Sequence, residues 1–464
     1  MSDRPNILFI MADQYRWDAL GCSGGWAETP NFDKIASEGV RFSSCVTNSP
    51  VCIPARVSLA TGRYPHNTGV WNNLHHNMPA DTPTWMQAIR NAGYRTSVFG
   101  KTHLHVHQGD LRDREHLVNA YGMDDVDEIG GPRASRRVLS HMTERWEKKG
   151  LWKAYQDDYD ERFKAKPCMV RPSVLPLEDY ADVYVGQQAK KYLAAYDRDQ
   201  PWFCWVSFGG PHEPWDAPEP YASMYRPEDM PKPMPPIEEA RARPASYLDV
   251  RYEHHPADVT DEELAAMRAN YAGNVSLIDA QVGEVMEAIA ARGELANTVI
   301  VFSSDHGEMN GDYGLVYKST FLNGAVRVPL LVRTPATLNG PARGSVSDGP
   351  VEWFDIGPTL VELAGGELGH RQFARSLCPV LADPAVDIRD EAVSELQGEV
   401  MIMDRDWKMA VNEKGQPYLL FDLRNDPDER RNLAGDPGMA EVEDELRMRM
   451  FRHILMNQVR MGAK

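Results

Sequence analysis

Short apolar runs alternate along the chain with stretches whose apolar residues recur at helical spacing. Runs of about six apolar or β-branched residues predict buried strands, and an apolar period of three to four residues predicts amphipathic helices. The predicted strands are Asn6–Met11, Val40–Val46, Thr96–Gly100, Trp202–Phe208, Thr298–Ser303 and Val328–Arg333. The predicted helices are Thr29–Gly39, Thr84–Ala92, Asp182–Tyr196 and Asp261–Ala291. This alternation predicts an α/β fold, in which helices flank a sheet.

Two internal segments break the alternation. Residues from His105 to Pro176 are charged and aromatic without a steady period, and Met224–Pro256 is too rich in proline for a regular element. These segments are either surface loops and linkers or walls of a binding site that set substrate choice.

The pattern changes again after a predicted helix at Phe354–Ala364. Four short strands and a final amphipathic helix near Met439–Leu455 predict a small antiparallel α+β unit. We therefore expect a main domain over residues 1–370 and a C-terminal subdomain over residues 371–464. The four strands are Ala392–Glu395, Val400–Met403, Lys408–Val411 and Tyr418–Leu423.

Composition and charge exclude several classes of protein. Of the 464 residues 42% are hydrophobic, and no apolar stretch approaches the ~18 residues that cross a bilayer, so no membrane partner is expected. The formal net charge of −18 argues against nucleic-acid binding, which needs a basic face. The first apolar run is interrupted by Asp13 and is too short for a signal peptide. Because the six cysteines fit neither a zinc site nor a disulfide framework, we expect a reducing, cytoplasmic setting.

The densest chemical signal is the segment Cys52-Ile-Pro-Ala-Arg56-Val-Ser-Leu-Ala-Thr61-Gly62, where a strand-like run ends and a helix begins. A cysteine at a helix N-terminus has a lowered pKa and faces anions with the helix dipole. A lone cysteine is more often a packing residue, so its neighbours decide. The pattern Cys-x-Pro-x-Arg followed by Thr-Gly resembles the maturation signature of the sulfatase family, which a separate maturase reads when it oxidises the cysteine to formylglycine.

By this resemblance Cys52 becomes an aldehyde whose hydrate attacks sulfur, and Arg56 holds the resulting alkoxide. The chemistry itself favours a hydrate. A serine would be left as a sulfate ester that hydrolyses slowly, whereas a geminal diol expels sulfate by collapsing back to the aldehyde.

Two polar pairs follow predicted strands, Asp13-Gln14 and Asp305-His306. Each pair alone is typical of a cap or a turn, but together they supply carboxylate, amide and imidazole groups. In the resembling family these positions bind one divalent cation, which carries over to Asp13, Gln14, Asp305 and His306. Many members have a second acidic residue in place of Gln14 and an amide in place of His306. Ca²⁺ is the first expectation, and the imidazole also admits Mn²⁺, Mg²⁺ or Zn²⁺.

Four further side chains are candidates for binding an anion: Lys101, His103, His212 and Lys318. An acidic protein that acts on an anion must gather cationic groups locally. Singly, such residues on loops are usually solvated. The resemblance makes His103 the base that collapses the hydrate. It makes Lys101, His212 and Lys318 sulfate ligands, and the last two stabilise or protonate the leaving alkoxide.

The resemblance covers nearly the whole chain, from Arg4-Pro-Asn-Ile to the segment from Phe421 to Ala434. It implies an α/β fold with a large mixed sheet flanked by helices on both faces, and a smaller C-terminal subdomain with a short antiparallel sheet. The implied partners are a small organic sulfate ester and, transiently, the maturase. Self-association through the irregular segments and the C-terminal helix stays open, as do aryl, alkyl, choline-like and carbohydrate alcohols.

Two other functions compete with sulfate-ester hydrolysis. Phosphonate monoester and phosphodiester hydrolases share the Cys-x-Pro-x-Arg nucleophile and the Asp-Gln and Asp-His pairs. The segment Gly100-Lys101-Thr102-His103 favours sulfate, because those relatives tend to have neutral hydroxyl residues in place of the Lys and His. A binding protein without turnover is less favoured, since it would have no chemical need for Arg56, His103, His212 and Lys318 beside intact metal ligands.

Overall fold

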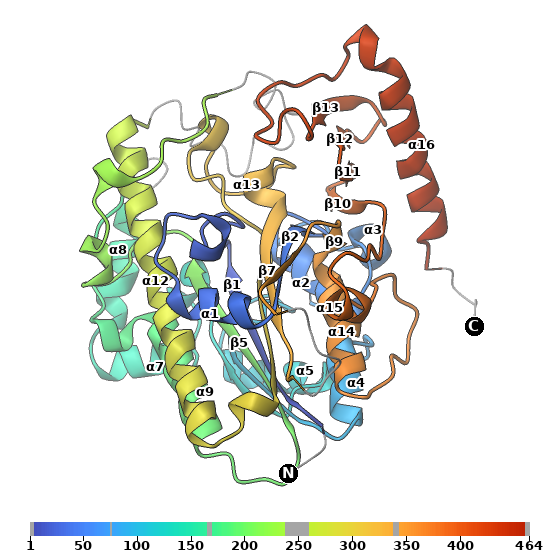
Figure 1. Ribbon diagram of the computed structural model, residues 1–464. Coiled ribbons are helices and arrows are strands. Elements are labelled where there is room, and N and C mark those ends of the chain that lie inside the picture. The colour runs from blue at the N-terminus through green and yellow to red at the C-terminus, as the bar shows by residue number, and fades with distance from the viewer. Residues whose placement is uncertain (1–3, 75–76, 165–168, 237–258, 337–342, 460–464) are drawn as a thin grey trace.

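A nine-stranded mixed sheet forms the centre of the computed structural model, which describes residues 4–74, 77–164, 169–236, 259–336 and 343–459 (Figure 1). The strand order is β4-β3-β5-β1-β6-β7-β2-β8, and β9 also pairs with β2. Neighbouring strands are parallel except where β7 pairs with β6 and β2. The predicted large mixed sheet is therefore confirmed. Its strands are β1 (Asn6–Asp13), β2 (Val40–Val46), β3 (Arg95–Gly100), β4 (Asp125–Glu128), β5 (Trp202–Pro211), β6 (Thr298–Ser304), β7 (Arg327–Arg333), β8 (Ser345–Ser347) and β9 (Val351–Glu352).

Helices cover both faces of this sheet, as predicted. Successive side chains of a strand point to opposite faces, so Ile7 and Phe9 belong to one core and Leu8 and Ile10 to the other. The core of Leu8 is covered by α1 (Pro30–Glu38), α7 (His141–Lys148), α8 (Trp152–Arg162), α9 (Ala181–Ala194) and α12 (Asp261–Ala291). The core of Ile7 is covered by α2 (Cys52–Thr61), α4 (Trp85–Asn91), α5 (Glu115–Ala120), α14 (Ile356–Leu363) and α15 (Cys378–Ala382).

Among the helices of the described residues, four lie outside these two layers, and three of these are single turns. They are α3 (Pro65–Thr68), α6 (Pro132–Ser135), α13 (Asn323–Val326) and α16 (Ala440–Met456). None of the described helices is both long enough and apolar enough to cross a lipid bilayer.

Each of the six predicted strands is present, and three of them continue beyond the predicted carboxyl end. β1 reaches Asp13, β5 reaches Pro211 and β6 reaches Ser304. The apolar pattern stops earlier because the last residues of these strands are small or polar, although the ladder still pairs Asp13 with Pro211. The chain therefore presents polar side chains from the carboxyl ends of three adjacent strands, where open α/β sheets bind ligands.

The segment between His105 and Pro176, for which the sequence pattern predicts no regular element, contains α5, α7 and α8 in its described part. α7 begins at a capping box in which Ser140 and Thr143 bind each other's backbone. α8 buries Tyr155 and Tyr159, one turn apart. Large aromatic side chains embedded among charged residues hide the helical period. Residues 165–168 and 237–258 of the two irregular segments lie outside the described residues.

The predicted antiparallel unit near the C-terminus is present as a four-stranded sheet. Leu446 and Met450 of α16 are buried against one of its faces. The unit meets the large sheet where the backbone N–H of Val393 donates to Glu352 Oε1 at 2.8 Å. The domain boundary at residue 370 stays a prediction. The strands are β10 (Ala392–Leu396), β11 (Glu399–Met403), β12 (Trp407–Val411) and β13 (Pro417–Asp422).

Candidate active site

Cys52 is the first residue of α2, a helix whose ten residues are all buried. No side chain of the preceding residue caps this helix, but Asn73 Oδ1 accepts the Ile53 N–H at 2.9 Å from a neighbouring loop. One of the free N–H groups at the helix start is thereby satisfied. Gly62 ends the helix in the left-handed conformation, with φ at 63°. The Cys52 thiol consequently lies at the positive end of the helix dipole.

The two polar pairs predicted as metal ligands lie side by side at the ends of β1 and β6. These strands are parallel neighbours with Ala12 opposite Ser304, so the residues that follow them meet. The Cys52 Sγ lies 3.0 Å from His306 Nε2 and 4.0 Å from Asp13 Oδ1. One ligand atom from each of Asp13, Cys52, Asp305 and His306 lies within 4.8 Å of the others.

Arg56 holds the two carboxylates of this cluster. Its side chain is fully buried, with Nε 2.7 Å from Asp305 Oδ2 and Nη2 2.9 Å from Asp13 Oδ2. Nη1 donates to the Lys101 carbonyl at 2.6 Å. Two buried carboxylates would be costly without such a partner, and the planar guanidinium fixes their relative position as well as their charge.

Gln14 connects the cluster to a second group of charges. Its backbone N–H donates to Asp305 Oδ1 at 3.2 Å. The side-chain amide donates to Glu213 Oε2 at 2.8 Å and also to Glu308, and its Oε1 accepts from Lys318 Nζ. The Gln14 side chain therefore fixes the Lys318 ammonium and two buried carboxylates at once.

The remaining predicted residues surround the thiol. Lys101 is 3% exposed and forms an ion pair with Asp13. His103 lines the same cavity as Cys52 and has a left-handed backbone, with φ at 56°. His212 donates from Nδ1 to the carbonyl of the next residue at 2.8 Å. The fold thus brings together all ten residues that the sequence marks as catalytic or metal-binding.

Electrostatics favour a reactive thiol beside a neutral imidazole. Burial raises the pKa of the Cys52 thiol, but Lys318, Lys101 and His306 lower it by more, so the pKa lies well below its usual range. Burial lowers the pKa of His103, and the charge of Lys101 lowers it further. At neutral pH the His103 ring is therefore neutral and able to accept a proton.

A cavity of about 250 Å³ opens over Cys52. Its wall includes four of the predicted catalytic residues, and further lining residues belong to α6 and its flanking segments. The lining residues are Cys52, Asn73, Leu74, Lys101, His103, His107, Gly131, Pro132, Arg133, Ala134, Arg137 and His212.

Comparison with known proteins identifies the family. The model of the sulfatase family matches residues 5–366, which is more than half of the chain. The chain belongs to the sulfatase family. A second model, described as the C-terminal part of N-sulphoglucosamine sulphohydrolase, matches residues 311–455 of this sulfatase-family chain. The family and the hydrolase class expected from the sequence are therefore confirmed.

Relatives of this sulfatase-family protein align over almost its whole length. An arylsulfatase of Clostridium perfringens is 27% identical over 97% of this chain and 94% of its own. The multifunctional alkaline phosphatase superfamily protein PehA of Trinickia caryophylli is 30% identical over 95% of this chain and 93% of its own. The crystal structure of the phosphonate monoester hydrolase of Agrobacterium radiobacter superposes with a TM-score of 0.81 at 27% identity, over 98% of this chain and 96% of the other.

Sequence reasoning missed several residues of the sulfatase site. Glu213 and Glu308 lie within motifs already singled out, next to His212 and two residues after His306, but no pattern predicts that both bind Gln14. Asn73 binds the start of α2 and lines the cavity.

A second cluster supports the cavity wall behind His103. Glu128, at the end of β4, lies 2.8 Å from His105 Nε2 and 3.1 Å from His107 Nε2. The ring centroids of His103 and His107 are 4.8 Å apart. His107 lines the cavity, so Glu128 fixes the ring against which His103 packs. The spacing His103-x-His-x-His107 is the one sequence signal that could have indicated this cluster.

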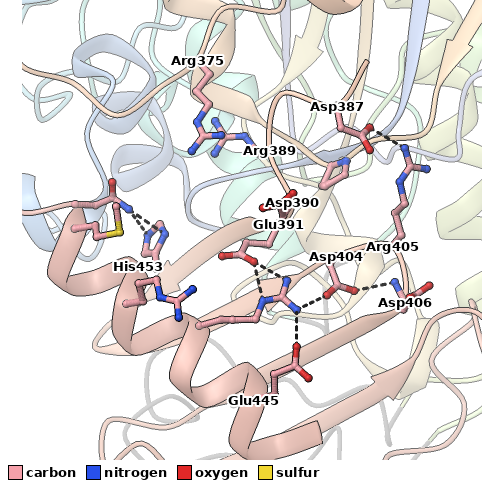
Figure 2. Close-up of a pocket in the computed structure, with 15 residues that line it drawn as sticks. Arg375, Asp387, Arg389, Asp390, Glu391, Asp404, Arg405, Asp406, Glu445 and His453 are labelled. Carbon is pink, nitrogen blue, oxygen red and sulfur yellow. Dashed lines mark hydrogen bonds and ion pairs between the residues drawn. The ribbon is translucent and has the colours of Figure 1, made fainter. Parts of the chain in front are cut away.

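A larger cavity of the sulfatase, about 580 Å³, lies between α16 and the C-terminal sheet (Figure 2). Its charged side chains neutralise one another. Arg449 binds Glu391 at 2.5 Å and Asp404 at 2.7 Å, and Arg405 binds Asp387 at 2.8 Å. None of the predicted catalytic residues lines it, so size alone does not identify the catalytic cavity.

Proposed function

We propose that the protein hydrolyses the sulfate ester bond of a small organic sulfate, with formylglycine derived from Cys52 as the nucleophile. The observation that carries the proposal is the position of Cys52, which lines a cavity and whose Sγ lies 3.0 Å from the imidazole of His306. Lys101, His103 and His212 line the same cavity, which fits an anionic substrate.

The residues present fit a divalent cation. Two carboxylates and one imidazole offer ligand atoms within 4.8 Å of one another, and all three side chains are fully buried. We assign Asp13, Gln14, Asp305 and His306 as the residues that would hold the cation. Oxygen donors favour Ca²⁺, and the imidazole also suits Mn²⁺ or Mg²⁺. When bound, such an ion polarises the sulfate oxygens and lowers the pKa of the nucleophile.

Formylglycine at position 52 would supply, as its hydrate, a hydroxyl that displaces the alcohol from sulfur. Loss of the proton from the second hydroxyl would then break the C–O bond to sulfate and restore the aldehyde. In this scheme His103 would take the proton of the second hydroxyl, a role that its lowered pKa and its position in the cavity wall with Cys52 support. Arg56 holds the alkoxide end of the nucleophile, and Lys101 binds a sulfate oxygen. His212 and Lys318 bind sulfate and stabilise or protonate the leaving alkoxide.

Hydrolysis of a phosphonate monoester or phosphodiester is the second candidate. The observation in its favour is the superposition with the phosphonate monoester hydrolase of Agrobacterium radiobacter, together with Gln14 and His306 at the ends of β1 and β6. Lys101 and His103 support sulfate instead. Both side chains lower the pKa of Cys52, and phosphonate relatives tend to have neutral hydroxyl groups at these two positions.

The test compares rates on an aryl sulfate and on an aryl phosphonate monoester with the same leaving group. The protein is produced together with a maturase, and Cys52→Ala serves as the blank. We expect faster turnover of the sulfate and none in the blank. A preference for the phosphonate would replace the proposed substrate, and full activity of Cys52→Ala would remove Cys52 as the nucleophile.

The cellular setting is part of the proposal. A reducing, cytoplasmic location agrees with the five described cysteines, Cys22, Cys45, Cys52, Cys204 and Cys378, which are all free. The maturase is a transient partner. We also propose that the chain divides into residues 1–370 and 371–464 and that it can self-associate.

A further inference from the structure

The wall of the catalytic cavity carries more positive charge than one sulfate group requires. Arg133 and Arg137 line it together with Lys101, and its described lining includes no aspartate or glutamate. The chain as a whole has a net charge of −18, so this wall is a local exception. Lys101 is paired with Asp13 beneath the lining, so the two arginines carry the positive charge that is free to attract a further anion.

The two arginines have no carboxylate partner within the part of the chain that the structure describes. Both side chains are exposed, and neither forms an ion pair, whereas Arg136 between them is paired with Asp160. Burial lowers the pKa of Arg136, and the charges of Arg137 and Arg133 lower it further. The charges of Arg133 and Arg137 therefore reach Arg136, and their effect adds to the larger effect of its burial.

The acidic group near Arg133 does not act as its ion-pair partner. The groups that act electrostatically on Arg133 are two tyrosines and Glu213. Glu213 lies outside the cavity lining and accepts a hydrogen bond from Gln14 at 2.8 Å. The face of Arg133 and Arg137 that meets the cavity is therefore available to a ligand.

The backbone that carries the two arginines is held in place by α8. Ser135 Oγ also donates to the Gly130 carbonyl at 2.8 Å, which closes the turn from within. A binding group on a fixed backbone loses less entropy when a ligand binds. Three side chains of α8 donate hydrogen bonds of 2.8 Å to carbonyl oxygens of this backbone. Trp152 Nε1 donates to residue 135, Tyr155 Oη to residue 132 and Gln156 Nε2 to residue 136.

We propose that Arg133 and Arg137 form a second anion subsite, which binds a carboxylate or a further sulfate on the alcohol portion of the substrate. This inference rests on the proposed function and names its substrate class, a sulfate ester whose alcohol carries another negative charge. The guanidinium fork matches carboxylate and sulfate oxygens. A cationic alcohol would meet like charge and is disfavoured.

The test uses aryl sulfates that differ only in the meta substituent: hydrogen, carboxylate, sulfonate and trimethylammonium. The kcat/KM of each is measured with mature protein at low salt, and the ratio of each charged substrate to phenyl sulfate is compared between variants. When the ratio for a variant is divided by the ratio for wild type, the intrinsic reactivity of each leaving group cancels. The variants are Arg133→Gln, Arg137→Gln and their combination. Arg136→Gln is the matched control, since it lies in the same turn but does not line the cavity.

We expect wild type to prefer both anionic substrates and to discriminate against the cationic one. Each single variant should lower the anionic preference about tenfold, the scale of one charge-assisted hydrogen bond. The combined variant should abolish it, Arg136→Gln should keep it, and added salt should weaken it. A carboxylate preference without a sulfonate preference would assign the subsite to carboxylates, and the reverse result to sulfates.

The subsite is refuted if the arginine variants keep the wild-type ratios, or if Arg136→Gln loses the preference equally. Turnover of phenyl sulfate distinguishes a failure of the subsite from a failure of the proposed function. Turnover of phenyl sulfate with unchanged ratios would overturn the subsite alone. Lack of turnover on every aryl sulfate would overturn sulfate hydrolysis and the substrate class with it.

Discussion

Replacing Arg56 by lysine separates the charge of this residue from its geometry. The guanidinium reaches Asp305 at 2.7 Å, Asp13 at 2.9 Å and the Lys101 carbonyl at 2.6 Å, through three different nitrogens. A lysine keeps the positive charge but has one nitrogen at its end, so it cannot bridge all three acceptors. The two carboxylates therefore lose the hydrogen-bonding partner that they share, while the local net charge stays the same.

The magnitude follows from the bonds that are lost. Lysine can replace one of the three, and each bond to a charged group contributes about 1.5–3 kcal/mol. We therefore expect the free energy of unfolding of Arg56→Lys to fall by about 3 kcal/mol or more. Catalysis should suffer further, because a misplacement of about 1 Å costs roughly 100-fold in rate. We expect kcat on an aryl sulfate to fall at least about 100-fold, with less metal bound per chain.

Arg162→Lys is the matched control. Arg162 is equally buried, binds Asp158 Oδ2 at 2.6 Å and donates to three backbone carbonyls. It does not line the catalytic cavity. Urea unfolding, metal analysis and kcat are measured for both variants. Both should lose stability, but only Arg56→Lys should lose metal and activity. If Arg56→Lys keeps the kcat and metal content of the control, the bracing role is wrong.

Two further predictions concern Gly131, beside Lys101, and His66 of α3, which contacts the C-terminal sheet. A Cβ at Gly131 would lie 3.0 Å from Lys101 Nζ and 3.2 Å from Cε, so Gly131→Ala should displace the ammonium and lower kcat/KM about tenfold. An unchanged kcat/KM would show that Lys101 needs no fixed position. Burial lowers the pKa of His66, but its hydrogen bond with Glu395 at 2.5 Å raises it overall. Because the folded pKa lies above the unfolded value of about 6.5, this stabilisation is complete below that pH and is lost as pH rises through the folded pKa. The Tm of wild type should therefore fall more than that of His66→Gln over this range, and parallel curves would contradict the assignment.

The part of the site that rests on strand ends could be predicted from the sequence. The apolar runs before Asp13 and Asp305 are unambiguous, and parallel pairing of β1 and β6 brings the two ends together. Cys52 follows a further strand and begins a helix, so its position at the same rim follows from the α/β architecture. Local pattern and global topology agree at these positions.

Other parts of the site depend on contacts that no local pattern encodes. Glu213 and Glu308 meet at the Gln14 amide because two loops fold toward each other, after β5 and β6. Arg133 and Arg137 look like ordinary surface charges in the sequence, and only the packing of α8 against their turn places them in the cavity wall. Tertiary contacts, rather than local conformational propensity, determine the positions of such residues.

The most direct test of the proposed chemistry is the mass of the peptide that carries Cys52, measured in protein produced with and without a maturase. Turnover of an aryl sulfate is recorded on the same two samples. We predict that an aldehyde replaces the thiol only in the sample produced with the maturase, and that turnover rises in proportion to the converted fraction. Equal turnover from protein in which Cys52 keeps its thiol would contradict formylglycine-dependent hydrolysis.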